Sequence, residues 1–341
     1  MKETILVEKA VGMVLPHDIT EIVKDKFKGR AFKKGHIIQK EDIEHLKRLG
    51  KEHIYVLQLG PEEIHENEAA RILALSLAGS GSIPSSEPVE GKIAIHASRD
   101  GILKINEQAL YQFNLLGEVM CSTLQTNTPV TKGETIAATR LIPLLSQRSI
   151  VQQATDIANE NSPIVEVKEL RKARAGLIIT GNEIFSGKIE DKFEKVLREK
   201  LATIGSEVLS VTFVPDDIQK ISTAITDAIA GGADLIITSG GMSVDPDDVT
   251  RRGIAEAGAT DCFYGTPVLP GAMFLSGHIG TIPVLGLPAC GMFHDITVFD
   301  LILPRILTGE TIGREEFAKM GHGGLCRNCK RCQYPVCNFG K

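Results

Sequence analysis

Residues 175–310 alternate short apolar runs with amphipathic stretches, and this alternation restricts the fold of the chain more than any other feature. Short runs rich in Ile, Leu and Val are typical of buried strands, and the stretches after them have helical periodicity. Such regular alternation predicts a parallel sheet with helices on both faces. We expect strands at 177–180, 207–214, 235–238 and 281–285, and helices at 189–204, 217–230, 248–257 and 292–307.

Smaller modules precede this α/β domain. The chain has 341 residues, enough for two or three domains with their own cores. Residues 1–86 read as a small mixed α+β module that ends in a Gly- and Ser-rich linker at 79–86, and residues 87–174 as a β-rich module with a connector. The α/β domain then spans 175–313, and 314–341 is a cysteine-rich tail.

Composition excludes several classes of function. The net charge is -5 and the pI about 6.0, and aromatic residues make up 5% with no Trp. Binding of nucleic acid through a basic face or an aromatic stacking surface is therefore not expected. No apolar run reaches the roughly 18 residues of a membrane span, and no leader opens the chain. We expect a cytoplasmic protein without a membrane partner.

Three of the predicted strands end in loops suited to a ligand. Their sequences are Thr-Gly-Asn-Glu at 180–183, Thr-Ser-Gly-Gly at 238–241 and Gly-Leu-Pro-Ala-Cys-Gly at 286–291. In a parallel sheet the carboxyl ends of the strands share one edge, where open α/β sheets bind ligands. The alternative is that glycine makes each turn tight and does nothing more.

The stretch from Asp234 to Asp248 is the most informative of these. Gly240 and Gly241 let backbone N–H groups approach a phosphate, which a following helix would also favour. The carboxylates that come next would repel a phosphate unless a metal intervenes. The stretch therefore predicts metal-assisted chemistry on a phosphorylated ligand. These carboxylates are Asp245, Asp247 and Asp248.

Residues 177–307 resemble the molybdopterin-binding domain that molybdopterin molybdenumtransferases and adenylyltransferases share with CinA-type proteins. The Thr-Gly-Asn-Glu-Ile sequence at 180–184 and Ser-Gly-Gly-Met-Ser-Val at 239–244 carry the resemblance. Weaker motifs within 90–143 are similar to the preceding part of a divergent molybdenumtransferase-like branch. The resemblance extends in total over 1–315.

This resemblance implies a pterin dithiolene whose phosphate lies among the glycine loops, in an enzyme that inserts molybdate. Glu183, Asp191 and Asp248 match the acidic positions of the family and would hold Mg²⁺ or position molybdate. The alternative for Asp191 and Asp248 is a carboxylate that only favours a helix start. The implied ligand-binding residues are Thr180, Gly181, Asn182, Ser239, Gly240, Gly241, Ser243, Pro288, Ala289 and Cys290.

The chain departs from the family pattern at several of these positions. Asn182 replaces an Asp, and Phe193 an Asn. The family's Pro-Gly-Lys-Pro is Pro-Gly-Ala-Met at 270–273, so a cation that could hold an anion is missing. Pro-Gly-Asn-Pro is Pro-Ala-Cys-Gly at 288–291, where the cysteine is either a soft ligand or a small buried side chain. The Asp-Asn-Ser-Ala-Met-Asp-Gly-Tyr signature of full-length transferases has no match.

Cysteines crowd the tail with spacing x2, x2 and x4. Three cysteines at two-residue intervals are typical of the loop around a bacterial [4Fe-4S] cluster, where the fourth follows after three residues. Zinc also binds four thiolates, usually from two separated pairs. A redox pair without metal is the third alternative. The four residues are Cys326, Cys329, Cys332 and Cys337.

Three functions fit these features. The first is a molybdenumtransferase-like enzyme that acts on adenylylated molybdopterin. The second is a non-catalytic molybdopterin carrier or sensor with a metal cluster in its tail, and the third is a CinA-like nucleotide pyrophosphatase. Fold alone does not choose among them. A homo-oligomer with a shared site would suit the family, and a molybdoenzyme is a candidate partner.

Overall fold

The chain folds into two compact units, described by a computed structural model over residues 3–23, 27–57, 59–160, 163–242 and 248–340. Unit 1 comprises Met1–Leu124 with Val130–Val167, and unit 2 comprises Gln125–Pro129 with Lys168–Lys341. Among the described residues, no helix has the length and apolar character needed to cross a membrane. The division into four parts that the sequence suggests stays a prediction.

Unit 1 begins with short strands around one small core. Strand β1 (Glu3–Leu6) pairs antiparallel with β4 (His53–Val56), and β2 (Ile19–Val23) pairs antiparallel with β3 (Phe27–Phe32). A 3-10 turn, η1 (Val7–Lys9), and helix α1 (Asp42–Arg48) complete this part. Its cluster of buried side chains holds Val7, Leu15, Phe32, Ile38 and Leu46 with others.

The rest of unit 1 places helices against a four-stranded antiparallel sheet. The sheet has the order β6 (Ser82–Pro84), β7 (Lys92–Ala97), β11 (Thr135–Leu141) and β9 (Val119–Thr123). One core joins it to α2 (Glu66–Leu77), α3 (Glu107–Leu115) and α4 (Arg148–Glu160). Short sheets join β5 (Glu63–His65) to β12 (Leu145–Gln147), and β8 (Gly101–Ile105) to β10 (Pro129–Val130) and β13 (Val165–Lys168).

The expected linker at 79–86 is wrong. Ser82 and Ile83 pair with Ala97 and His96, so this stretch forms the edge strand β6 of the sheet. Gly79 is confined as well, because a Cβ there would lie 2.2 Å from the Pro163 side chain. Small residues are favoured here by close packing, which composition alone cannot distinguish from flexibility.

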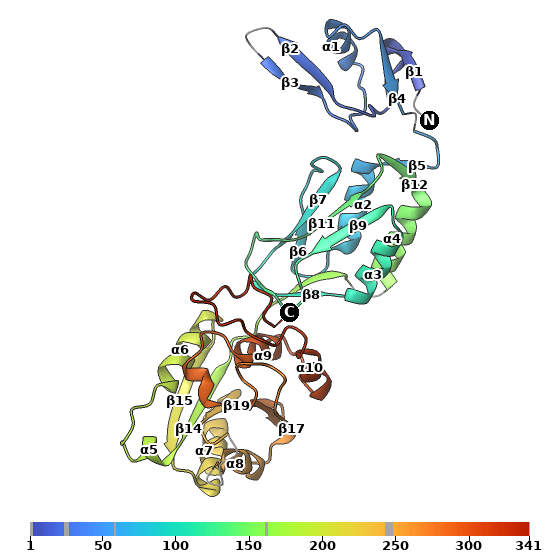
Figure 1. The fold of residues 1–341 in the computed structure, drawn as a ribbon. Coiled ribbons are helices and arrows are strands. Elements are labelled where there is room, and N and C mark those ends of the chain that lie inside the picture. Colours follow the sequence, from blue (N-terminus) through green and yellow to red (C-terminus); the bar gives the residue numbers. More distant parts are fainter. Residues whose placement is uncertain (1–2, 24–26, 58, 161–162, 243–247, 341) are drawn as a thin grey trace. The chain divides into compact units, whose positions relative to one another are not determined.

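Unit 2 is built on a six-stranded mixed sheet (Figure 1). Its order is β15 (Glu207–Val214), β14 (Arg174–Thr180), β16 (Leu235–Ser239), β19 (Ile282–Leu287), β18 (Leu275–Ile279) and β17 (Thr260–Tyr264). The first four strands run parallel, whereas β18 and β17 are antiparallel to their neighbours. The expectation of a wholly parallel sheet is therefore met only in part.

Alternate residues of the central strands enter two separate cores. Leu177 and Ile237 pack in one core with α6 (Phe193–Thr203) and α9 (Val298–Leu307). Ile178 and Ile236 pack in the other with α7 (Ile218–Ala230) and α8 (Thr250–Glu256). The period of two along each strand thus sends neighbouring side chains to opposite faces.

Two of the expected helices of unit 2 are shorter in the structure. The helix expected at 189–204 begins only at Phe193, as α6, and a separate short helix, α5 (Asn182–Phe185), precedes the expected range. The helix expected at 292–307 consists of a 3-10 turn, η2 (Ala289–Met292), and α9, whose cap is Thr297. In both cases a polar capping side chain sets the start of the helix later than the apolar periodicity does.

The tail begins with α10 (Arg314–Lys319) and continues without a further helix or strand among the described residues. Phe317 and Phe339 are buried in the same core as α9. Backbone hydrogen bonds also join the tail to the domain, since Leu269 N–H donates to Gly324 O and Cys326 N–H to Leu269 O, both over 2.8 Å. The tail is therefore part of unit 2.

Candidate functional site

The three predicted loops leave unit 2 at one edge of its sheet. In the parallel register, Ile179 of β14 lies opposite Ser239 of β16, and Ser239 lies opposite Leu287 of β19. The next residues along the chain, Thr180, Gly240 and Pro288, therefore leave the sheet beside one another. The structure thus brings together the three loops that the sequence singled out.

Hydroxyl groups join the first two loops. Thr180 Oγ1 lies 3.1 Å from Ser239 O, to which it donates, and 2.9 Å from Thr250 Oγ1. All three side chains are at most 1% exposed. Ser239 Oγ is also buried and has no hydrogen-bond partner among the described residues. A buried hydroxyl without a partner is uncommon, and an ordered water would satisfy it.

The glycine pair of the second loop packs against the first loop. Gly240 and Gly241 have φ of 87° and 55°, conformations that other residues rarely adopt. A Cβ on Gly240 would lie 2.4 Å from Thr180 O, and one on Gly241 2.3 Å from Thr250 Oγ1. The structure therefore gives both glycines a packing role, independent of any ligand.

Asn182 and Glu183 follow Gly181 in the first loop. Asn182 N–H donates to Asp216 Oδ2 over 2.9 Å, and Asp216 N–H donates to Asn182 Oδ1 over 3.2 Å. This reciprocal pair connects the loop after β14 to the loop after β15. The Glu183 side chain is exposed, and Gly181 beside it has φ of 138°.

The other predicted carboxylates differ in position. Asp191 caps α6, because its carboxylate accepts from Phe193 N–H at 3.0 Å and from Glu194 N–H at 2.9 Å. Asp248 is half-buried just before α8. The segment 243–247, which includes Ser243, Asp245 and Asp247, lies outside the described residues. Helix α8 has seven residues, so its dipole contributes less than the longer predicted helix would.

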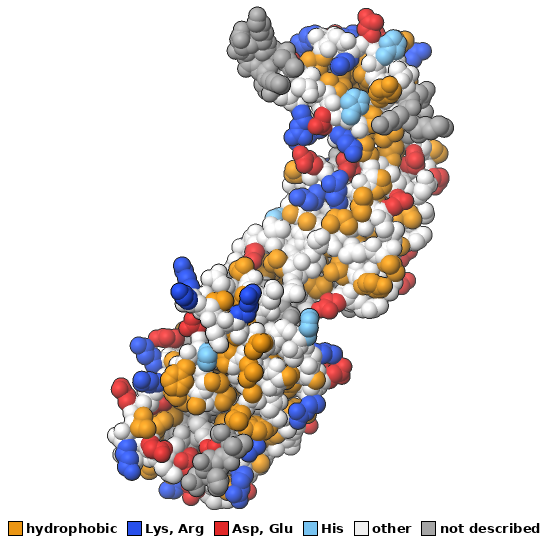
Figure 2. Space-filling model, in the orientation of Figure 1, with side chains coloured by type: hydrophobic (Ala, Val, Ile, Leu, Met, Phe, Trp, Pro, Cys, Tyr) orange, Lys and Arg blue, Asp and Glu red, His pale blue; other side chains and the backbone are white. Residues whose placement is uncertain are grey.

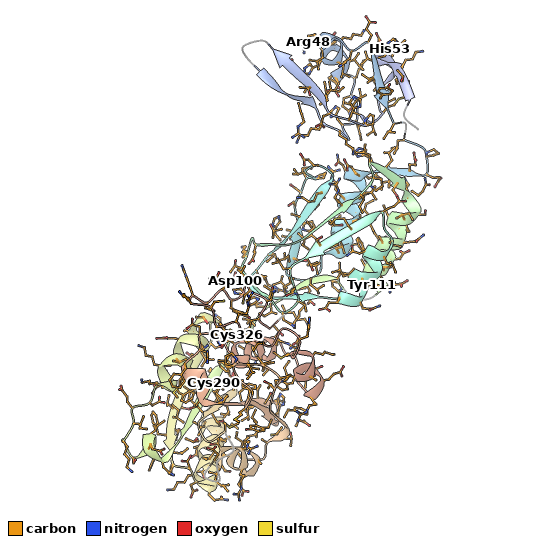
Figure 3. All side chains as sticks on the ribbon, viewed as in Figure 1. Arg48, His53, Asp100, Tyr111, Cys290 and Cys326 are labelled. Carbon is orange, nitrogen blue, oxygen red and sulfur yellow. The ribbon has the colours of Figure 1, made fainter. Side chains whose placement is uncertain are left out.

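The third loop forms η2, with Ala289 exposed and Cys290 half-buried. Burial raises the pKa of the Cys290 thiol, while a backbone hydrogen bond lowers it. The neutral thiol is therefore favoured over the thiolate, the form that binds metals. Figure 3 shows Cys290 in unit 2, on the same unit as Cys326 of the tail.

Sequence reasoning missed three residues of this region. Thr250 falls within the helix expected at 248–257 and Asp216 directly before the one expected at 217–230, yet each pairs with a residue of the first loop. Tyr264 of β17 donates from its hydroxyl to Met242 O over 2.6 Å, and Arg251 lies over its ring at 4.1 Å. No local pattern marks such partners, because they are distant in sequence.

The four tail cysteines line a different cavity of unit 2, of about 400 Å³. None of them forms a disulfide. Among the described residues, no three His, Cys, Asp or Glu side chains gather closely enough to hold one metal ion.

Unit 1 has a charged pocket of about 240 Å³, and Figure 2 shows Lys and Arg beside Asp and Glu on this unit. Its charges are largely paired: Arg140 contacts Glu66 at 3.1 Å and Arg30 contacts Asp18 at 3.4 Å. Paired charges of this kind stabilise a surface weakly and do not define an anion site.

Two family models match parts of the chain. Residues 176–308 match a model described as a probable molybdopterin binding domain. Residues 4–58 match one described as a domain of unknown function. The first match covers all three loops of the sheet edge, and the cysteines of the tail lie beyond it.

Similar sequences include two kinds of protein. The molybdopterin molybdenumtransferase of Haemophilus influenzae is 29% identical over 166 residues, which are 47% of this chain and 40% of that protein. A CinA-like protein of Mycobacterium sp. (strain JLS) is 35% identical over 83 residues, 24% of this chain and 20% of that protein. The chain thus spans less than half the length of either relative.

Similar solved structures include CinA from Thermoplasma acidophilum, described as of unknown function. It is 22% identical, covers 35% of this chain and 90% of its own, and has a TM-score of 0.33. The tungsten cofactor synthesizing protein MoaB from Pyrococcus furiosus is 21% identical. It covers 41% of this chain and 97% of its own, with a TM-score of 0.32. At these values the likenesses carry no argument about function.

Proposed function

We propose that unit 2 binds a molybdopterin-type pterin at the edge formed by the loops after β14, β16 and β19. The observation that carries the proposal is the register of these strands, which places Thr180, Gly240 and Pro288 beside one another. The match of 176–308 to a probable molybdopterin binding domain supports the same ligand. Ser239 Oγ, buried without a partner among the described residues, is available to a ligand at this edge.

The pterin phosphate would contact neutral donors rather than cations. The loop residues 180–183, 239–242 and 288–291 contain no Lys or Arg. Backbone N–H groups bind anions when the loop that carries them is held in place, and here the Thr180 hydroxyl holds the loops by donating to Ser239 O and contacting Thr250 Oγ1. Binding of this kind would fix the position and orientation of the pterin. Gly181, Asn182, Ser243, Ala289 and Cys290 complete the proposed binding set.

We further propose a molybdenumtransferase-like reaction in which molybdate and adenylylated molybdopterin are the substrates. Glu183, Asp191 and Asp248 are the carboxylates proposed to act with Mg²⁺. Oxygen ligands suit this hard cation, but among the described residues no three carboxylates gather around one point. A complete Mg²⁺ site would need oxygens from the bound substrate. The residues of this chain would therefore position the substrates.

A non-catalytic carrier is the second candidate, and the structure offers one observation in its favour. Asp191 uses both carboxylate oxygens to cap α6, so it is less available to a metal. A CinA-like nucleotide pyrophosphatase is the third candidate, and the similarity to a CinA-like protein over 83 residues supports it. A homo-oligomer, a molybdoenzyme partner and a cytoplasmic location stay predictions.

The experiment measures binding and turnover with the full chain. Titrated molybdopterin should raise the melting temperature, because a ligand that binds only the folded state stabilises it. Conversion of adenylylated molybdopterin with molybdate and Mg²⁺ would establish the transferase. Binding without conversion would establish the carrier, and hydrolysis of a nucleotide sugar would favour the pyrophosphatase. An unchanged melting temperature at saturating molybdopterin would overturn the pterin site.

Two substitutions separate capping from catalysis at Asp191. Asn keeps one of the two acceptor oxygens of Asp191, so Asp191→Asn should keep part of the stability that Asp191→Ala loses, about 1 kcal/mol. If the carboxylate takes part in turnover, Asp191→Asn should still lower the turnover rate at least tenfold. Asp227→Asn, at an exposed position of α7, is the control that should leave both properties unchanged. Full turnover in Asp191→Asn would restrict Asp191 to its structural role.

A further inference from the structure

The four tail cysteines surround one cavity. The cavity has a volume of about 400 Å³, and its lining includes all four of these side chains. The segment Phe293–Ile296, between η2 and α9, forms part of the same lining. Side chains separated by up to eleven positions in sequence thus face one space, although no disulfide joins them.

Backbone hydrogen bonds close the tail into a loop around this cavity. Gly340 N–H donates to Gly323 O over 3.0 Å, so the two ends of the segment 323–340 meet. A turn brings the fourth cysteine back, since Cys337 N–H donates to Gln333 O over 3.2 Å. Long loops without regular secondary structure are uncommon in compact domains unless they have a function. We therefore expect this closed loop to have a function of its own.

The cysteines form an inner and an outer pair. Cys326 and Cys337 are half-buried and pack against the core of unit 2. Cys329 and Cys332 are exposed. Phe339, which is buried, and Tyr334, which is partly buried, pack in the core of unit 2 and hold the loop to it. Two thiols of the cavity lining are thus partly buried against the core and two are exposed.

We propose that this cavity binds a [4Fe-4S] cluster through the four cysteines, at a site separate from the pterin edge. A single Zn²⁺ needs its thiolates about 2.3 Å from one centre. The tail instead has three cysteines at two-residue intervals, which is typical of the loop around a [4Fe-4S] cluster, whereas zinc thiolates usually come from two separated pairs. In a four-iron cluster each thiolate binds a different iron, so the thiolates surround a volume, as they do here.

The surroundings of the cavity suit an anionic cluster. Each thiol loses its proton when it binds iron, so the occupied site carries negative charge. Arg327 lines the cavity, and Lys330 and Arg331 lie between the second and third cysteines. Cations near thiolates offset their charge, and the buried apolar side chain of Phe339 lines part of the cavity.

The test is the metal content of the full chain, purified without air or reconstituted with Fe²⁺ and sulfide. We expect about four iron atoms and about four acid-labile sulfides per chain, with a visible absorption that dithionite bleaches. Zinc at one atom per chain in place of iron, or no bound iron after reconstitution, would overturn the proposal. The measurement does not depend on pterin, so it stands or fails independently of the function proposed for the sheet edge.

Matched cysteine variants assign the ligands. Cys329→Ala removes an exposed thiol of the cavity and should lower the bound iron at least tenfold. Cys262→Ala removes an exposed thiol of β17 outside the cavity and should bind as much iron as the unaltered chain. Both variants remove exposed side chains, and circular dichroism checks that each one folds. Equal iron in folded Cys329→Ala and in the unaltered chain would contradict the cluster as proposed.

Discussion

At the scale of single residues, the sheet edge depends on contacts between loops. Thr180 contacts both Ser239 and Thr250, and the glycine pair fits only because it has no side chains. Asn182 exchanges two hydrogen bonds with Asp216. These contacts hold the edge in one conformation before any ligand arrives, which lowers the entropy cost of binding.

Gly240→Ala should destabilise the protein more than Gly258→Ala does. Both glycines have positive φ, 87° and 88°, so alanine costs each about 1–2 kcal/mol through its backbone. Only at position 240 does the new Cβ also meet a backbone atom, Thr180 O at 2.4 Å, whereas at 258 it meets nothing within 4 Å. We expect an additional loss of about 1–3 kcal/mol in urea unfolding. Equal losses would show that the loop relaxes freely.

At the scale of elements, polar caps decide where the helices begin. Asp217 accepts from Lys220 N–H and starts α7, and Thr297 and Asp300 form a capping box at α9. Asp191 does the same for α6. A residue chosen from sequence as catalytic can therefore be a cap, because carboxylates at the start of a helix satisfy free N–H groups.

His65, the cap of α2, should make the stability of unit 1 depend on pH. Its Nδ1 accepts from Asn67 N–H over 3.2 Å, which requires the neutral ring. Burial lowers the pKa of His65, although the carboxylates of Glu66 and Glu68 oppose this. With a folded pKa below the unfolded value, the contribution is present above pH of about 6.5 and is lost as the pH falls through the folded pKa.

The measurement compares melting temperatures at pH of about 7.5 and 5.5. His65→Asn retains a capping oxygen but does not titrate, so it should reduce the loss at the lower pH. His53→Asn, at an exposed position of the same unit, should leave the loss unchanged. If His65→Asn loses as much melting temperature at the lower pH as the unaltered chain does, groups other than His65 cause the pH dependence.

At the scale of the whole molecule, each unit has its own buried core. Phe113 of α3 belongs to a cluster of unit 1, and Phe299 of α9 to a cluster of unit 2. These two side chains are 0% and 1% exposed. The proposed pterin site and the proposed cluster site both lie in unit 2, so the function of unit 1 is not accounted for by either.

Substitution of either phenylalanine by alanine should lower the stability of one unit only. Phe113→Ala and Phe299→Ala should each cost about 3–5 kcal/mol, because each leaves a cavity. In calorimetry of the full chain we expect two transitions, with each substitution lowering the midpoint of one. A shift of both transitions by either substitution would show that the units unfold together.

Local patterns predicted much of the fold of both units. In unit 1 the sequence patterns predict strands at 92–97 and 101–105 and a helix at 107–115, and the structure has these bounds, as it has for the strand expected at 207–214. Alternation and a capping residue such as Asn106, which accepts from Ala109 N–H, are encoded within a few positions. Strands β6 and β17 were not predicted, because an edge strand is defined by its partner more than by its own sequence, and neither was β18, which pairs with β17.

The sequence by itself determined the alternating α/β unit and the edge of the sheet at which its glycine loops meet, because strand direction and loop position follow from the order of short-range patterns. It also determined the spacing of the tail cysteines. Only the tertiary structure decided that Thr250 reaches Thr180, that Asp191 caps a helix, and that the four cysteines face one cavity. These contacts join residues distant along the chain or depend on exact helix ends, and close packing fixes them only once the whole unit has folded.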